Sequence, residues 1–149
     1  MEQKTVAIIP RQPSVFLAQD ALLAAVPGFF HCTDFYSSRN QHALALNADG
    51  TLNTCSNGAK LGSKVTIFMN GIGQTQPAQK TGAINPGPPV EITPGAAGSG
   101  IISTTTSPGS ISGVAKVQVR ANGTGFLEVT PTVAGVSTRE PIVIWVAGK

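Results

Sequence analysis

The sequence predicts an all-β fold, and three observations support this prediction. The Asp49-Gly50 pair lies between the apolar run 43–46 and Thr51-Leu52, and Asp-Gly supplies the positive φ angles that tight hairpin turns require. Residues 114–121 alternate apolar and polar side chains, which is the period of a half-buried strand. Charged residues make up only 11% of the chain, which also contains 17 Gly and 11 Pro. This balance is typical of short strands joined by turns.

The first elements are the least defined. Residues 5–9 (TVAII) predict a strand. Residues 14–26 have the Ala and Leu content of a helix, although we favour strand and irregular structure there, so that residues 1–27 form the least defined part of the domain. Residues 29–36 hold three of the six Phe and the only Tyr. They predict a strand that contributes to the core.

Hairpin and strand signals continue along the rest of the chain. We expect a hairpin at 42–53, a strand at 64–70, and a connection rich in Pro and Gly at 71–89 that is either a wrapped surface loop or mobile. Further strands are predicted at 90–93, 101–105 and 114–121. In the last of these, one set of side chains faces the core and the alternate set faces solvent; the two sets are Ala115, Val117 and Val119, and Lys116, Gln118 and Arg120.

A final hairpin is predicted about Ala134-Gly135, with residues 126–133 and 136–146 as its arms. Pro131 and Pro141 lie inside these arms. Because proline has no N–H to donate to a neighbouring strand, the two prolines predict edge positions or bulges.

Length and charge restrict the classes of function. A chain of 149 residues suits one domain, residues 1–149. The ten Lys and Arg are scattered singly, whereas nucleic-acid binding relies on clustered cations and stacking aromatics, so we expect no nucleic-acid partner. No apolar run approaches the roughly 18 residues of a membrane span. The N-terminus also lacks the basic segment of a secretory signal, which taken alone favours a cytoplasmic protein.

Three motifs occur in a particular order: ALNADGTLN, then Ser56-Asn57, then GSKVTIFMNGIGQTQP. This order resembles a family of immunoglobulin-like domains at the C-terminal ends of large secreted acidobacterial proteins. Residues 24–29 (AAVPGF), the turn at 107–109 (SPG) and residues 141–147 (PIVIWVA) extend the resemblance. The chain departs from the family between residues 90 and 106, where only the VEIT segment fits.

The resemblance implies an immunoglobulin-like antiparallel β-sandwich of seven to nine strands. It also implies a noncatalytic module of an exported bacterial protein, secreted or at the cell surface, that acts as a spacer, an attachment domain or a protein-interaction domain. Its partners would then be other domains of a larger polypeptide, or a cell-surface protein or glycan. A carbohydrate-binding module is the alternative, and a small hydrolase is a third.

One cluster has the character of metal ligands or a nucleophile: His31, Cys32, Asp34 and His42. A zinc site needs three or four such groups converging on one point, and Cys-His catalysis needs a thiolate beside its base. Because neighbouring residues of a strand point to opposite faces, His31 and Cys32 do not share a ligand sphere in an extended segment. We therefore expect no catalytic, cofactor-binding or metal-binding residues and no cofactor.

Two further features have alternative interpretations. Residues 47–53 superficially resemble a calcium loop, but the position of a bidentate Glu is occupied by Gly58, so a hairpin turn is favoured. Cys32 and Cys55, the only two cysteines, either form a disulfide across the hairpin or remain buried thiols.

Trp145 and Val143 belong to the apolar segment IVIWV, in which both faces of a strand would be apolar. Such a strand is either covered on both sides or exposes an apolar face to which a partner can bind. We favour Trp145 as a core residue, with an interaction surface at Trp145 and Val143 as the alternative.

Overall fold

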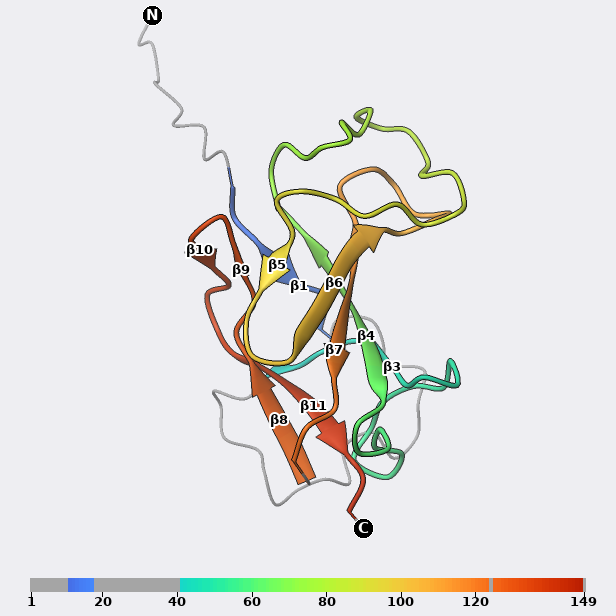
Figure 1. Cartoon of the computed structure of the whole chain (residues 1–149), viewed down its shortest axis with the longest axis vertical. Helices are drawn as coiled ribbons and strands as arrows, with labels where there is room; N and C mark the ends of the chain where they lie inside the picture. The colour runs from blue at the N-terminus through green and yellow to red at the C-terminus, as the bar shows by residue number, and fades with distance from the viewer. Residues whose placement is uncertain (1–10, 18–40, 124, 149) are drawn as a thin grey trace, which may run out of the picture.

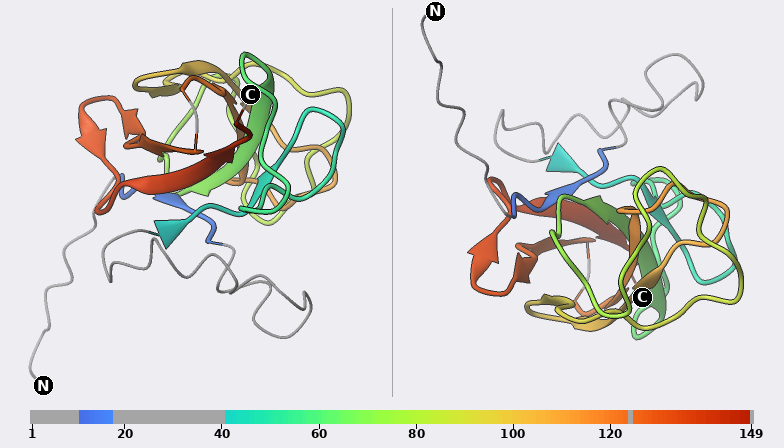
Figure 2. Two further views of the ribbon diagram at one scale, coloured as in Figure 1. Left: turned by 90° about the horizontal axis from the view of Figure 1, so that it is seen from below. Right: turned by 90° about the horizontal axis from the view of Figure 1, so that it is seen from above.

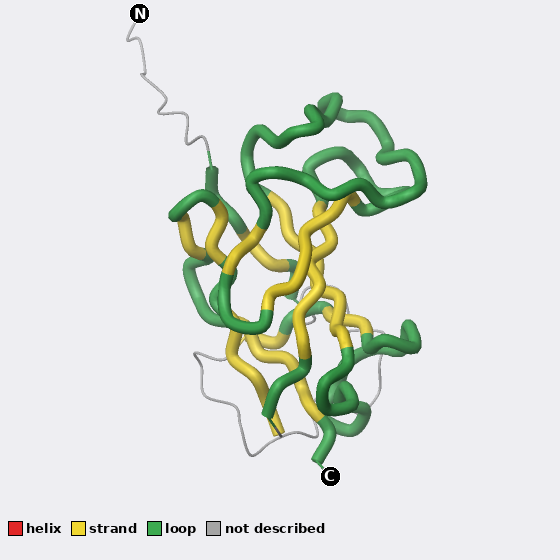
Figure 3. Tube along the Cα trace, in the orientation of Figure 1, coloured by secondary structure: helices red, strands yellow, loops and turns green. Residues whose placement is uncertain are grey.

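A computed structural model describes residues 11–17, 41–123 and 125–148, and these residues contain strands and loops but no helix. Figures 1 and 3 show the strands crossing the middle of the molecule, with long loops at both ends. The all-β prediction is confirmed. No helix in the described residues has the length and apolarity needed to cross a membrane.

The largest sheet has five strands and is antiparallel throughout. Its order is β1-β4-β7-β6, and β3 also pairs with β4. Cross-strand neighbours such as Ile67 and Val117 are both fully buried. The strands are β1 (Ser14–Val15), β3 (Ala45–Leu46), β4 (Lys64–Asn70), β6 (Ile101–Thr106) and β7 (Ala115–Arg120).

Two three-stranded sheets complete the fold. In the order β2-β11-β8, the pair β2 and β11 is parallel and the pair β11 and β8 is antiparallel. In the order β10-β9-β5, all pairs are antiparallel. The strands are β2 (Gln41–His42), β5 (Ala96–Ala97), β8 (Gly125–Val129), β9 (Thr132–Val133), β10 (Val136–Ser137) and β11 (Ile142–Val146).

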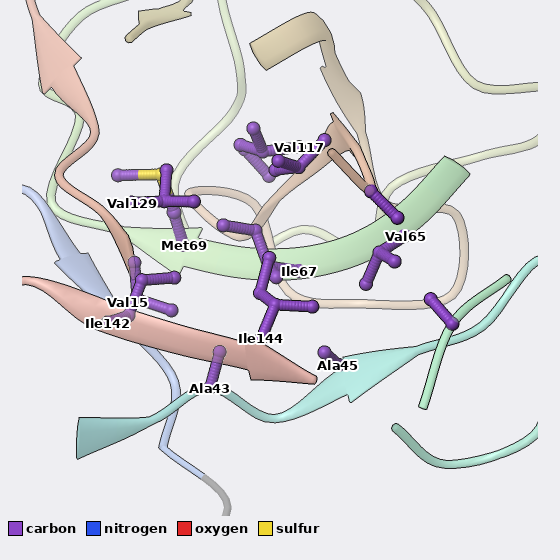
Figure 4. Packing of buried hydrophobic residues seen from close by; sticks show 14 of the residues in the cluster. Val15, Ala43, Ala45, Val65, Ile67, Met69, Val117, Val129, Ile142 and Ile144 are labelled. Atoms are coloured by element: carbon purple, nitrogen blue, oxygen red, sulfur yellow. The ribbon is translucent and has the colours of Figure 1, made fainter. Parts of the chain in front are cut away.

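The hydrophobic core lies between the five-stranded sheet and β11 (Figure 2). Ile67 of β4 and Ile144 of β11 point toward one another, and neither side chain is exposed to solvent (Figure 4). Residues 41–46 pass from one sheet to the other, because β2 pairs with β11 and β3 pairs with β4. The apolar faces of two layers are thus buried against each other, as a β-sandwich requires.

Several predicted strands are confirmed. The structure has β4 at 64–70, as predicted, and β6 and β7 lie within one residue of the predicted bounds. In β7, burial alternates from Ala115 to Val119, with every second side chain buried. The alternation therefore marks a half-buried strand.

Other predictions require correction. Residues 90–93 form only single bridges, from Glu91 to Thr105 and from Thr93 to Gln76, and not a strand. The arm 126–133 is divided at Pro131 into β8 and β9, and the arm 136–146 is divided before Ile142 into β10 and β11. Proline cannot donate to a ladder, so the prolines end strands here rather than marking bulges within them.

The turn at Asp49-Gly50 differs in detail from the prediction. Asn47 N–H donates to Thr51 O (2.8 Å) and Gly50 N–H donates to Asn47 O (2.9 Å), but only Gly50 has a positive φ (81°). This corresponds to a three-residue loop rather than a two-residue turn. The turn with two positive φ angles is at Ala134 (47°) and Gly135 (82°), between β9 and β10.

The first predicted elements are only partly covered. Residues 5–9 and 29–36 lie outside the described residues, as does most of the segment 14–26. In its described part, Ser14 and Val15 form β1 against the end of β4.

Candidate functional site

Of the predicted cluster of polar groups, only His42 lies in the described residues; His31, Cys32 and Asp34 lie outside them. His42 is buried in β2, and its ring stacks on that of Trp145 with 5.3 Å between centroids and 13° between planes. Burial lowers the pKa of His42 because desolvation disfavours the charged form. Within the described part of the chain, no three His, Cys, Asp or Glu side chains are placed to hold a metal ion together.

Trp145 and Val143 are both buried, with exposed fractions of 8% and 3%. Phe126 of β8 meets the Trp145 ring edge to face, at 6.4 Å between centroids. This packing favours a core role for the two residues over an interaction surface.

The turn that resembles a calcium loop uses its polar groups within the protein. The Asp49 carboxylate accepts hydrogen bonds from Thr51 N–H (3.0 Å) and Thr51 Oγ1 (2.6 Å), and these bonds lower the pKa of Asp49. Asn47 Oδ1 accepts from Asn53 Nδ2 at 2.8 Å, and Asn47 Nδ2 donates to Asn57 O at 2.9 Å. The arrangement favours a self-contained hairpin turn, as the sequence interpretation did.

Cys55 is a disulfide-bonded cysteine and not a free thiol. Cys32 lies outside the described residues. The pairing of Cys32 with Cys55 therefore stays a prediction.

The long connection 71–89 packs against the loop between β6 and β7 as a wrapped surface loop. Asn85 N–H donates to Ser110 O (2.8 Å), and Ser112 N–H donates to Ala83 O (2.8 Å). Asn85 itself is buried, and its Nδ2 donates to Ser107 O at 3.3 Å. These bonds fix two loops side by side at one end of the molecule (Figure 1, top), which we call the loop end.

The loop end exposes two large apolar side chains. Ile84 and Ile111 oppose each other in a single antiparallel bridge, and each is 60% exposed. We call this pair the apolar tip. No other large apolar side chain in the described residues is as exposed, and clustered exposed apolar groups often mark interaction sites.

A cleft of about 880 Å³ lies at the same end. Most of its lining residues carry an amide or hydroxyl group, and one is charged; the lining consists of Arg11, Gly73, Gln74, Thr75, Gln76, Ala78, Gln79, Thr81, Ser112 and Gly113. A smaller cleft of about 500 Å³ lies between β1 and residues 137–142. Both volumes fall in the range of small-molecule sites.

Sequence reasoning did not find the larger cleft. Its lining comes from three separate segments, and no local motif joins Arg11 to Ser112. The one local signal is the density of Gln and Thr in residues 74–81, which by itself predicts only a loop.

Comparison of the chain with protein-family models, with curated proteins and with solved structures finds no match.

Proposed function

We propose that the chain is a noncatalytic immunoglobulin-like module of an exported bacterial polypeptide and that it binds a protein partner through its loop end. The order of the strands supports the immunoglobulin-like part of this proposal. In an immunoglobulin constant-type sandwich, one sheet contains strands A, B, E and D, and the other contains C, F and G. Here β1-β4-β7-β6 corresponds to A-B-E-D when the strands are lettered along the chain.

Five of the remaining strands, all except β3 and β10, fit this lettering. Strand β5 is then C and pairs with β9, which follows β8 after two residues and forms strand F with it. Strand β11 is G, and it pairs with β8. The parallel partner of β11, β2, precedes strand B in the chain, so it belongs to the A segment.

The loop end supports an interaction role. With this lettering, the long loop between β4 and β5 is the B–C loop and residues 107–114 form the D–E loop. Loops at one end of this scaffold carry the binding surfaces of variable domains, and rigid loops on a stable sandwich are common sites of function. The apolar tip gives such a surface an anchor for a partner.

A carbohydrate-binding module is the second candidate, and the lining of the larger cleft favours it. Amide and hydroxyl side chains dominate that lining, and such groups can bond sugar hydroxyls. Phe16, at 37%, is the only exposed aromatic residue of the described part, and it does not line the cleft. We therefore place the protein partner first.

Site-specific photo-crosslinking in the native polypeptide tests the interaction role. A photoreactive amino acid at position 84 is expected to give a defined crosslinked product, whereas the same amino acid at position 61 gives none. Leu61 is 47% exposed in a turn outside the loop end and is the matched control. Equal crosslinking from both positions, or none from position 84, would contradict the proposal.

Export is tested separately by treating intact cells of the source organism with protease. An antibody to the module should detect its loss from intact cells or its presence in the medium. Retention of a protease-protected module inside the cells would contradict export.

A further inference from the structure

The larger cleft holds an arginine whose side chain is hydrogen-bonded in place and whose charge has no ion-pair partner among the residues that the structure describes. Arg11 Nε donates to Ile72 O at 2.8 Å, and Ile72 is buried in the core. The neighbouring Gln12 N–H donates to Gly71 O at 2.9 Å, which ties this segment to the end of β4. The guanidinium is therefore held at the cleft by its inner nitrogen.

The two outer nitrogens of Arg11 make no hydrogen bond or ion pair with the residues that the structure describes. Those two nitrogens form a planar fork that matches the two oxygens of a carboxylate. Lys80 lies in sequence between the lining residues Gln79 and Thr81 and is exposed, although it does not itself line the cleft. Glu91, the acidic residue nearest to this loop in sequence, does not line the cleft.

Other lining residues of the cleft are held by hydrogen bonds within the protein. Gln79 Nε2 donates to Thr75 Oγ1 (3.4 Å), and Gln79 Oε1 accepts from Gly113 N–H (2.8 Å). Gln74, Gln76 and Thr81, in contrast, are exposed and make no side-chain hydrogen bond within the described residues. Their amides and hydroxyl are thus available to a ligand, while Gln79 and Thr75 already have partners within the protein.

The chemistry of the lining distinguishes two classes of acidic ligand. Ala78 is the largest apolar side chain of the lining, so a peptide side chain would find no apolar anchor. A ring that carries several hydroxyls beside a carboxylate would instead meet amide and hydroxyl partners as well as the guanidinium fork.

We propose that this cleft binds the carboxylate of an acidic saccharide, with Arg11 as its partner and Gln74, Gln76 and Thr81 bonding the hydroxyls of the same or the next sugar. The inference rests on the loop end as the binding end of the module, and it adds a ligand class that the apolar tip does not recognise.

Calorimetric titration of the whole chain tests the inference, with an oligomer of galacturonic acid as the probe. A neutral galactose oligomer of equal length and an Asp- and Glu-rich peptide are the comparison ligands. We expect saturable binding of the acidic saccharide that weakens with salt, and at least about tenfold weaker binding of the neutral one.

Arg11→Gln should weaken binding of the acidic saccharide about tenfold or more, and Arg11→Lys should restore part of the loss, because the charge returns without the fork. Lys60→Gln, in a turn distant in sequence from the cleft lining, is the matched control and should change nothing. Chemical shifts recorded for each variant verify that it is folded.

Three outcomes would overturn the inference: equal binding of the neutral saccharide, tighter binding of the acidic peptide, or no binding up to about 10 mM, beyond the weak end of specific affinities. None of these outcomes affects the crosslinking test at position 84. Failure of the saccharide site and failure of the protein-interaction site are therefore distinguishable.

Discussion

The side-chain amide of Asn53 is hydrogen-bonded at both ends to the main chain of Trp145. Asn53 Nδ2 donates to Trp145 O and Trp145 N–H donates to Asn53 Oδ1, each at 2.8 Å, across 92 residues of sequence. Asn53 is buried. The hairpin of residues 45–53 is thereby joined to the last strand, β11, by a pair of bonds that imitates one rung of a sheet.

Asn53→Ala should lower the free energy of unfolding by about 1–3 kcal/mol, because it removes the acceptor of the buried Trp145 N–H. It also removes one of the two donors to Trp145 O, which keeps its bond from Ala59 N–H at 2.9 Å. Asn57→Ala is the control. Asn57 is exposed and its amide donates to Thr51 Oγ1 and Leu52 O, so its loss should cost at most about 1 kcal/mol. Urea titrations of both variants measure the difference, and equal losses would contradict a special role for Asn53.

Val117→Asp and Gln118→Asp should differ sharply in stability. Val117 is fully buried between Ile67 and Thr104 on the neighbouring strands, and an unpaired carboxylate there costs several kcal/mol, comparable to the stability of a small domain. Gln118 faces the other side of β7, where Ser103 Oγ donates to it at 3.5 Å. Its replacement should cost no more than about 0.5–1 kcal/mol. Denaturant titration measures both, and a larger loss at position 118 would contradict the strand assignment.

The stability of the protein should fall as the pH decreases below 6.5. Burial lowers the pKa of His42 from 6.5, so the unfolded chain binds a proton more readily than the folded one in this window. The contribution of His42 is then fully present above 6.5 and is lost as the pH falls toward the lowered pKa of the folded state.

His42→Phe provides the control for this pH dependence, because it keeps a ring against Trp145 without a titrating group. Urea titrations at about pH 7.5 and about pH 5.5 should show a smaller loss of stability in His42→Phe than in the unaltered protein. An equal pH dependence of stability in both proteins would mean that titrating groups other than His42 cause the loss of stability.

Gly71→Ala should destabilise the protein by at least about 2 kcal/mol. Gly71 has a φ of 70°, and a Cβ atom there would overlap the carbonyl oxygen of Gln12. Gly50→Ala is the control, because Gly50 also has a positive φ but has open space around it, so it should cost only the backbone strain of about 1–2 kcal/mol. Thermal unfolding of the two variants measures the difference. Equal decreases in melting temperature would mean that the close approach of Gln12 does not restrict the residue at position 71.

Cys32 and Cys55 should be joined when the protein is produced in an oxidising compartment. Closing a loop of about 24 residues stabilises a fold by on the order of 3 kcal/mol. Intact mass after thiol alkylation without reductant measures the pairing. Two labels on the denatured protein would contradict it.

Local sequence predicted two kinds of strand. In one kind apolar and polar side chains alternate, and in the other a continuous apolar segment lies between turn residues. β4 and β7 are of the first kind, since each buries every second residue. Sequence could not predict which strands become neighbours. The pairing of β11 with both β8 and β2 depends on the closure of the whole core, and no local pattern in Ile142–Val146 records it.

The residues of the candidate site were harder to predict, for a related reason. Arg11 lines the cleft because β1 pairs with the end of β4, which brings the start of the described chain to residues 72–79. Asn53 was seen only as part of a turn, because its partner is 92 residues away. Trp145 and Val143 were correctly assigned to an apolar strand. The sequence alone did not show whether that strand is covered or forms an interaction surface, and the burial of both residues in the folded protein favours the first alternative.

The position of β11 has a consequence for how the protein is made. All five of its residues are buried, and they contact segments that leave the ribosome much earlier: β2, Asn53, and Ala59, which bridges to Val146. Until Val146 has been synthesised, those earlier segments lack the strand that completes their core. Folding must then join parts of the chain that are far apart in sequence, which is a slow step for β-proteins. Whatever acts on the nascent chain, whether a chaperone or a translocation machine, therefore meets it before it is folded.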